Sequence, residues 1–251
     1  MKILIVANWK MNPVTVEQAK TLFGFVKKGI KNTKNAEVVI CPPFIYLGIL
    51  SGLSMGGQDS FWEEKGPFTG AISPEMLKNL GCEYVIIGHS ERRENFLETD
   101  EMTNKKIKRA LAAKLNPILC AGETAEERKN GQTESVLKRE IMGGLKDISK
   151  EDVSRITIAY EPIWAISKGD PYQTKEIPTP DNIKKISFYI RGLLSEIYGQ
   201  ETVQNIRIIY GGSANSENAR GFIKEAGMQG LLVGGASLVA EEFIKLVKNV
   251  A

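Results

Sequence analysis

The chain has 251 residues, of which 42% are hydrophobic, and its 33 basic and 30 acidic residues give a formal net charge of +3. This length and composition can bury a substantial core, so we expect one domain over residues 1–251. The small net charge, with no long single-sign block, argues against a nucleic-acid partner but is compatible with a local basic pocket for a small anion.

The three cysteines and the single histidine limit which disulfides and metal sites the chain can form. Cys41, Cys82 and Cys120 are odd in number and far apart, which is typical of reduced cysteines in a cytoplasmic protein. His89 is the single histidine, which excludes a multi-histidine metal site, and the sequence carries no nucleotide motif. We therefore expect neither a metal nor a cofactor. The apolar run before Asn8 is too short for a signal peptide, and we expect no membrane span.

Short apolar runs alternate with longer amphipathic stretches along the whole chain. The runs are rich in isoleucine and valine, as expected for strands that are covered on both faces. Their spacing indicates right-handed crossovers and a parallel sheet, and eight such units favour an α/β fold with a closed, single-domain (β/α)8 barrel. The predicted strands are Ile3–Ala7, Val38–Cys41, Met55–Gln58, Tyr84–Ile87, Ile118–Ala121, Ile156–Tyr160, Ile206–Tyr210 and Gly230–Val233.

Two kinds of helix-start signal follow these strands. One is capping-box spacing, in which a threonine precedes a glutamine or glutamate by three residues. The other is a hydroxyl N-cap placed before a proline in the first turn. The pairs are Thr15 with Gln18, Thr124 with Glu127, Ser73 with Pro74, and Thr179 with Pro180.

Residues with useful chemistry follow several of the predicted strands. In a parallel barrel the carboxyl ends of all strands meet at one rim, where ligands bind. We therefore expect these residues to lie close together. They are Asn8 and Lys10 after the first strand, His89 and Glu91 after the fourth, Glu161 after the sixth, Gly211-Gly212-Ser213 after the seventh, and Gly234-Gly235 after the eighth.

Glu161 ends an apolar run and is followed by Pro162, which disfavours helical angles at the carboxylate and aims it into a loop. Alone, a solvated strand end is the simpler interpretation. The thirteen residues from Ala165 to Ile177 show little periodicity, and such long loops in compact domains are uncommon and often serve as lids. We therefore predict an active-site lid over about residues 165–178.

The other rim residues suggest complementary roles, although a surface lysine, a capping histidine and tight glycine turns explain each one separately. Two glycine-rich turns after the last two strands favour a phosphate site. Lys10 would stabilise a developing oxyanion, and His89 before a helix would stay neutral and donate a proton. Glu91 would orient Lys10 or else pair with the neighbouring arginines, Arg92 and Arg93. Together they indicate cofactor-free proton abstraction next to a carbonyl in a small phosphorylated molecule.

Motifs that run from one end of the chain to the other support this interpretation. They are Asn8-Trp9-Lys10-Met11-Asn12, Gly66-Pro67-Phe68-Thr69-Gly70, Gly88-His89-Ser90-Glu91-Arg92-Arg93, Cys120-Ala121-Gly122-Glu123-Thr124, Ala159-Tyr160-Glu161-Pro162-Ile163-Trp164-Ala165-Ile166, Tyr210-Gly211-Gly212-Ser213 and Leu232-Val233-Gly234-Gly235-Ala236-Ser237-Leu238. In these motifs the chain closely resembles the triosephosphate isomerase family. The resemblance implies interconversion of dihydroxyacetone phosphate and D-glyceraldehyde 3-phosphate in glycolysis and gluconeogenesis.

The resemblance also implies a role for each matched residue. Glu161 would be the base that moves a proton between two carbons, and His89 would shuttle protons on the oxygens. The enediolate would be steadied by Lys10 and Asn8, with Glu91 in support. The phosphate would be held by Gly169, Ser213, Gly234 and Gly235.

Two further expectations come from the resemblance. The loop tip Phe68-Thr69-Gly70 implies a homodimer in which Thr69 docks near the partner subunit's active site. In the family the next residue is often an acid that pairs across the dimer with the arginine aligned to Arg92, but here it is Ala71. The lid departs further: about half a dozen residues are inserted, and the C-terminal hinge is unrecognisable, although the N-terminal hinge at Pro162 is intact.

Two alternatives stay open beside an active triosephosphate isomerase. The lengthened lid would shape a pocket for another small phosphorylated sugar, with the same proton-transfer chemistry. Alternatively, the chain would be a phosphate-binding scaffold that has lost catalysis, an interpretation that the retention of Asn8, Lys10, His89 and Glu161 opposes. Parallel assays with several small phosphorylated aldoses and ketoses separate these three functions.

Overall fold

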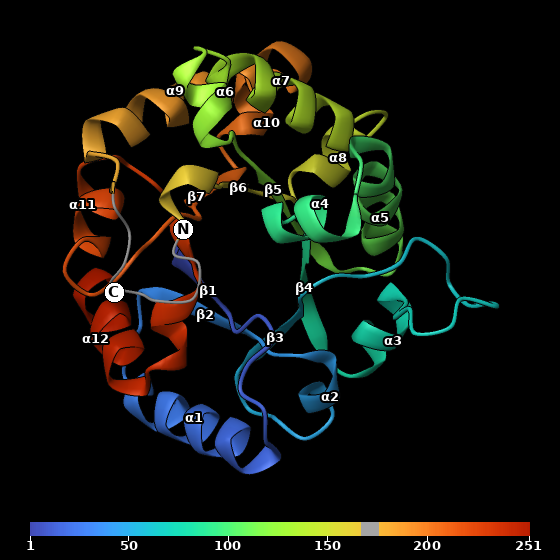
Figure 1. The fold of residues 1–251 in the computed structure, drawn as a ribbon, viewed down its shortest axis with the longest axis vertical. Coiled ribbons are helices and arrows are strands. Elements are labelled where there is room, and N and C mark those ends of the chain that lie inside the picture. Colours follow the sequence, from blue (N-terminus) through green and yellow to red (C-terminus); the bar gives the residue numbers. More distant parts are fainter. Residues whose placement is uncertain (167–175) are drawn as a thin grey trace.

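The computed structural model describes residues 1–166 and 176–251, in which eight parallel strands form a closed barrel in chain order (Figure 1). The predicted barrel and all of its strands are confirmed, with strand bounds that differ from the predicted ones by at most two residues. The strands are β1 (Ile3–Asn8), β2 (Ala36–Cys41), β3 (Ser54–Gly57), β4 (Cys82–Ile87), β5 (Asn116–Ala121), β6 (Thr157–Tyr160), β7 (Arg207–Tyr210) and β8 (Gly230–Val233).

Helices surround this barrel on all sides (Figure 1). The longest is α9, whose buried residues repeat at helical spacing and pack towards the strands. The helices are α1 (Val16–Gly29), α2 (Phe44–Leu47), α3 (Pro74–Asn79), α4 (Ser90–Phe96), α5 (Asp100–Ala112), α6 (Ala125–Lys129), α7 (Thr133–Gly144), α8 (Lys150–Val153), α9 (Pro180–Tyr198), α10 (Gln200–Val203), α11 (Ala219–Lys224) and α12 (Ala240–Val250), with 3-10 turns η1 (Ile163–Ala165) and η2 (Gly235–Leu238). Among the described residues, we find no helix with the length and hydropathy that a membrane crossing requires.

The predicted helix caps are present. Thr124 and Glu127 form a complete capping box, in which each side chain accepts a hydrogen bond from the backbone of the other residue. Thr15 accepts from the backbone N–H of Gln18, but no reciprocal hydrogen bond is present, so that site is a simple N-cap. Ser73 and Thr179 cap α3 and α9, each followed by a proline at the first helical position.

Alternating residues of the strands build two buried layers. In β1, Leu4 and Val6 belong to one apolar cluster, whereas Ile5 and Ala7 belong to the larger one that includes helix residues. All four side chains are fully buried. The strands therefore read as continuous apolar runs because both of their faces are covered.

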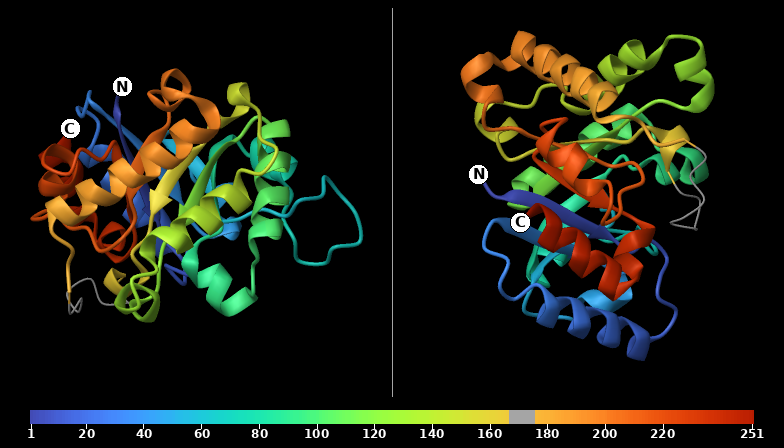
Figure 2. Two further views of the ribbon diagram at one scale, coloured as in Figure 1. Left: turned by 90° about the horizontal axis from the view of Figure 1, so that it is seen from above. Right: turned by 90° about the vertical axis from the view of Figure 1, so that its left-hand side faces the viewer.

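The segment between β3 and α3 projects away from the barrel (Figure 2). Three aromatic rings gather within it: Phe61 stacks on Trp62 with centroids 4.0 Å apart, and Phe68 lies 4.7 Å from Phe61. Phe68 stays 40% exposed. The projecting loop thus carries an aromatic cluster of its own, whereas Ile72 near its end packs against the barrel core.

A group of four charged residues, of which Glu98 and Lys106 are buried and Asp59 and Arg92 are partly exposed, lies where this loop leaves the barrel. Asp59 Oδ1 lies 2.7 Å from Lys106 Nζ, and Asp59 Oδ2 lies 3.0 Å from Arg92 Nη2. Glu98 contacts the same two cations. Burial raises the pKa of Asp59 from about 3.8 to about 6, because loss of hydration outweighs the attraction of Lys106 and Arg92.

We predict that Asp59 makes the stability of the protein depend on pH. Because its pKa of about 6 in the folded state exceeds the value of 3.8 expected in the unfolded chain, the folded state binds the extra proton. The stabilisation is fully present below pH 3.8 and is lost as the pH rises through 6, by about 3 kcal/mol. Urea unfolding from pH 4 to 8 should show this fall for the wild type and a shallower one for Asp59→Asn. Parallel curves for the two proteins would contradict the prediction.

Candidate active site

A cavity of about 160 Å³ opens at the carboxyl end of the barrel strands. Its walls bring together most of the residues predicted from the strand ends, although they come from five different strands or the loops that follow them. These residues are Asn8, Lys10, His89, Glu161, Ser213, Gly234 and Gly235. Gly169, the remaining predicted phosphate ligand, and most of the predicted lid at 165–178 lie outside the described residues.

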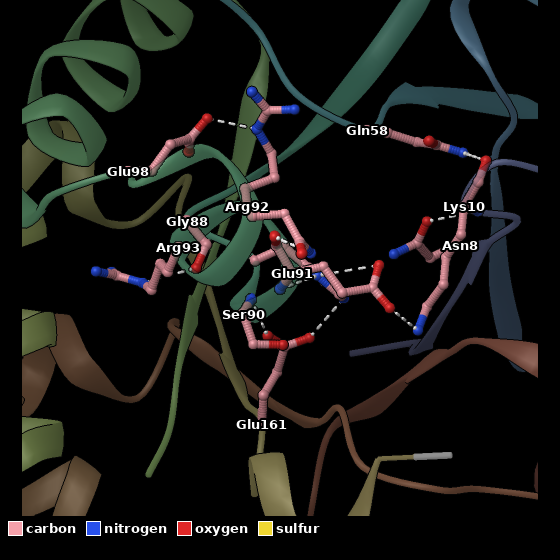
Figure 3. Close-up of polar contacts among 12 residues, drawn as sticks. Asn8, Lys10, Gln58, Gly88, Ser90, Glu91, Arg92, Arg93, Glu98 and Glu161 are labelled. Carbon is pink, nitrogen blue, oxygen red and sulfur yellow. Dashed lines mark hydrogen bonds and ion pairs between the residues drawn. The ribbon is translucent and has the colours of Figure 1, made fainter. Parts of the chain in front are cut away.

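Glu161 is 1% exposed and sits directly after β6. Its Oε2 accepts a hydrogen bond of 3.1 Å from the backbone N–H of Ser90, at the start of α4 (Figure 3). Its Oε1 has no hydrogen-bond partner among the described residues and lies 3.1 Å from Nε2 of His89. One carboxylate oxygen is therefore anchored, and the other is available to accept a proton.

His89 is the N-cap of α4, and its side chain is 7% exposed. Its Nδ1 accepts a hydrogen bond of 3.2 Å from the backbone N–H of Glu91. An Nδ1 that accepts a hydrogen bond carries no proton, so the ring proton belongs on Nε2, which lies 3.1 Å from Oε1 of Glu161. The role of His89 as a neutral proton donor stays a prediction.

Lys10 is held in a backbone conformation that is uncommon for lysine, with a φ of 54°. Its N–H donates to Oδ1 of Asn8 at 3.0 Å, and its carbonyl accepts from Nε2 of Gln58 at 2.9 Å. Its ammonium lies 2.6 Å from Oε1 of Glu91 (Figure 3). Contacts of the backbone and of the ammonium group therefore fix the position of the positive charge. They also offset the cost of the unfavourable backbone conformation, which is about 1 kcal/mol or more.

Glu91 lines no part of the main cavity, yet its contact with Lys10 decides between the two roles expected for it. Both neighbouring arginines use other acids: Arg92 pairs with Asp59 and Glu98, and Arg93 pairs with Asp100 at 2.6 Å. Glu91 is thus the partner of the lysine. A second cavity, lined by Glu91 together with Asn12 and Asn95, adjoins this pair.

The glycine turn after β7 packs closely against Glu161. A Cβ added at Gly211 would lie 2.8 Å from Cγ of Glu161, and one added at Gly212 would lie 2.2 Å from the Tyr210 hydroxyl oxygen. The backbone N–H of Ser213 donates to the carbonyl of Ala165 at 2.9 Å. Glycine is therefore required at 211 and 212 by packing against the site, in addition to any contact with an anion.

Cys120 lies in the strand beside that of Glu161 and is fully buried. Burial raises the pKa of its thiol well above the usual value, and the nearby negative charge of Glu161 raises it further. Since the thiolate is the reactive form of cysteine, Cys120 is a packed, unreactive thiol.

The sequence did not single out three residues that support the site. Gln58 bridges the carbonyl oxygens of Lys10 and Cys41 through its side-chain nitrogen. Glu123 is 1% exposed and accepts from the indole N–H of Trp164 at 2.8 Å. Ser90 supplies the N–H that anchors Glu161. Position at a strand end is the signal shared by Gln58 and Glu123, and Ser90 acts through its backbone, which leaves no side-chain signal.

Across residues 1–166 and 176–251, no cluster of three or more His, Cys, Asp or Glu side chains is arranged to hold a metal ion.

Comparison with known proteins agrees with this geometry. A model of the family described as triosephosphate isomerase matches residues 3–250. The chain belongs to the triosephosphate isomerase family. Curated triosephosphate isomerases from Caldanaerobacter subterraneus subsp. tengcongensis, Endomicrobium trichonymphae and Dictyoglomus thermophilum are each 44% identical to it, over 97%, 98% and 98% of this chain and 98% of each relative. As a triosephosphate isomerase family member the protein is an isomerase.

We predict that Gly211→Ala impairs turnover by displacing Glu161. The new methyl group would sit 2.8 Å from Cγ of Glu161 and 3.3 Å from the Tyr160 carbonyl oxygen, so the carboxylate or the strand must move. Because small misplacements of a catalytic group cost about 10² in rate, kcat for triose phosphate isomerisation should fall by roughly 10- to 100-fold. Gly192→Ala in α9 is the matched control, since no side chain or neighbouring backbone atom of the described residues lies within 4 Å of its new methyl group. Equal rates for both variants would contradict the prediction.

Proposed function

We propose that the protein interconverts dihydroxyacetone phosphate and D-glyceraldehyde 3-phosphate by proton transfer through an enediolate, as a step of glycolysis and gluconeogenesis. The observation that carries the proposal is the pairing of an unbonded carboxylate oxygen of Glu161 with the Nε2 of His89, 3.1 Å away, in a buried cavity. Base and proton donor thus face the same small volume. Family membership supplies the substrate pair.

Glu161 acts as the base. Its free Oε1 takes the proton from the carbon next to the substrate carbonyl, and the electrons of that C–H bond form the carbon–carbon double bond of the enediolate. The same carboxylic acid then returns the proton to the neighbouring carbon. With 1% exposure, Glu161 works in a volume from which water is largely excluded, where electrostatic interactions are strongest.

His89 and Lys10 stabilise the charge that develops on oxygen. The proton on Nε2 of His89 is donated to the carbonyl oxygen as it becomes an oxyanion and is then exchanged between the two substrate oxygens. Lys10, whose charge is held in place by Glu91 at 2.6 Å, and Asn8 add a cation and an amide on the same side of the cavity. Since these groups are fixed before the substrate arrives, little reorganisation accompanies the reaction.

We assign the phosphate group of the substrate to the part of the cavity wall formed by the residues that follow β7 and β8. Ser213, Gly234 and Gly235 lie there after the last two strands, and Gly235 begins the turn η2. The backbone N–H groups of Gly234 and Gly235 suit phosphate because glycine allows the chain to approach closely, whereas the N–H of Ser213 already donates to the Ala165 carbonyl. By the resemblance, Gly169 completes this phosphate site.

The direct test compares the wild type with Glu161→Gln in a coupled assay of glyceraldehyde 3-phosphate isomerisation. Gln keeps the shape of the side chain but removes its basicity, so kcat should fall by about 10²–10⁴ with a smaller change in KM. Glu196→Gln, an exposed carboxylate on α9, is the control and should keep wild-type rates. Other small phosphorylated aldoses and ketoses are assayed in parallel. A wild type that prefers one of these, or that fails to turn over triose phosphates, would refute the proposal.

We also propose that the protein is a cytoplasmic homodimer in which the loop tip Phe68-Thr69-Gly70 docks against the partner subunit. The projecting loop, the 40% exposure of Phe68 and the cavity beside Lys10 and Glu91 support this arrangement. The three buried free cysteines are consistent with a reducing compartment.

Sedimentation equilibrium at micromolar concentration tests the proposed dimer. The wild type should show twice the chain mass of 27.7 kDa, and Phe68→Asp should shift the protein towards the monomer because it places a charge in the apolar contact. Phe188→Asp, which alters an exposed phenylalanine on α9, serves as the control and should stay dimeric. A monomeric wild type would rule the arrangement out.

A further inference from the structure

A network of buried and partly buried charged side chains connects the backbone on either side of the proposed active site. Its central members are Arg93 on α4 and Glu140 on α7, and neither of them lines the cavity. Glu140 is 5% exposed, and the Arg93 side chain is 17% exposed. The network is separate from the charged group around Asp59.

Glu140 holds the backbone on which Glu161 rests. Its Oε2 accepts a hydrogen bond of 3.0 Å from the N–H of Gly122. Gly122 touches the catalytic residue directly, since a Cβ added there would lie 1.8 Å from the carbonyl oxygen of Glu161. The preceding residue, Ala121, accepts a hydrogen bond of 2.8 Å from the N–H of Glu161. Any shift of this segment is therefore passed to the base.

Arg93 holds the backbone that leads into His89. Its Nε donates to the carbonyl of Gly88 at 2.9 Å (Figure 3). Gly88 has a φ of 72°, a conformation that favours glycine, and an added Cβ would lie 3.2 Å from Arg93 Nη2 and from Thr103. The turn that presents His89 is thus packed directly against the guanidinium.

Charge connects the two halves of the network. Nη1 of Arg93 lies 3.9 Å from Oε1 of Glu140 and 2.6 Å from Oδ1 of Asp100. The exposed Arg139 is closer to Glu140, since its Nη2 donates to the same Oε1 at 3.2 Å. Burial raises the pKa of Glu140, and the positive charge of Arg93 acts most strongly against that rise. Nη2 of Arg93 is buried without a hydrogen-bond partner among the described residues. A buried ion pair with an unsatisfied donor adds little to the free energy of unfolding, so we look for a role of the Arg93–Glu140 pair other than stability.

We propose that Glu140 and Arg93 are positioning residues that set the distance between the base Glu161 and the proton donor His89. Glu140 accepts a hydrogen bond from the backbone near Glu161, and Arg93 donates one to the backbone next to His89. The attraction between Glu140 and Arg93 then fixes the position of one backbone segment relative to the other. The inference rests on the proposed function, because it assigns an effect on the catalysed proton transfer. Neither residue touches the substrate, so both act on turnover and not on substrate binding.

The test is a pair of substitutions at Glu140. Glu140→Leu removes the acceptor of the Gly122 N–H, whereas Glu140→Gln keeps a side-chain oxygen in its place. We expect Glu140→Leu to lower kcat by about 10- to 100-fold with KM changed less than about threefold, and Glu140→Gln to recover most of the loss. Glu98→Leu and Glu98→Gln are matched controls, since Glu98 is equally buried in an ion cluster but contacts neither Gly122 nor Gly88. All rates are compared per folded protein, measured by circular dichroism.

The single histidine provides a readout that needs no turnover. The ring ¹⁵N chemical shifts of His89, unique in the spectrum, report its tautomer and its hydrogen bonds. They should move in Glu140→Leu, return towards wild type in Glu140→Gln, and stay unchanged in both Glu98 variants. This measurement separates the two proposals: an inactive wild type refutes the proposed function, whereas the ¹⁵N shifts still test the network.

Two results would overturn the inference. One is a Glu140→Leu variant whose kcat and His89 shifts match those of Glu98→Leu. The other is an equal loss in Glu140→Leu and Glu140→Gln, which would mean that the hydrogen bond to Gly122 carries no positioning effect. Arg93→Lys keeps the positive charge but loses the Nε donor to Gly88, and it should lower kcat at constant KM. A wild-type kcat in Arg93→Lys would exclude Arg93 from the role.

Discussion

The pairing of the first strand with the last is the constraint on which the site depends. β1 runs parallel to β8 in a register that joins Leu4 to Gly230 and Ala7 to Val233. The contact is close enough that a Cβ at Gly230 would lie 2.0 Å from the Leu4 carbonyl oxygen. Because this pairing closes the barrel, residues more than 200 positions apart in sequence, such as Lys10 and Gly234, line one cavity.

One short segment at the end of β4 organises the cavity once the barrel is closed. His89 caps α4, and the backbone N–H of Ser90 donates a hydrogen bond to Glu161. The carboxylate of Glu161 therefore lies at the N-terminal end of α4, where the helix dipole attracts a negative charge. Glu91 holds the ammonium of Lys10. The next two residues, both arginines, pair with acids that do not line the cavity. About a turn and a half of helix therefore carries the residues of the cavity together with Arg93, the member of the proposed positioning network on α4.

The barrel and most of the residues that line its cavity could be predicted from the sequence, because the signals for strands and strand ends are short and local in the chain. β-branched runs such as Ile3–Ala7 identify strands, and once the barrel is inferred, parallel strand ends must meet. Side chains at those ends, including Glu161 and His89, could therefore be placed in one site. Gln58 and Glu140 could not be assigned. Their partners lie 48 and 18 residues away and are backbone atoms, which leave no trace in residue identity.

The buried charges that the sequence did not reveal share one physical character. Burial raises the pKa of Asp59 and of Glu140, so in both places the fold disfavours the charged acid even with an arginine nearby. Apolar residues of similar volume would fill such positions at a lower desolvation cost. An apolar side chain cannot accept a hydrogen bond from a backbone N–H or fix a guanidinium at a set distance. Glu140 keeps a carboxylate whose burial costs desolvation free energy, at a position where it accepts a hydrogen bond from Gly122, which packs on the backbone of Glu161. This is consistent with selection for the geometry of the site over the stability of the barrel.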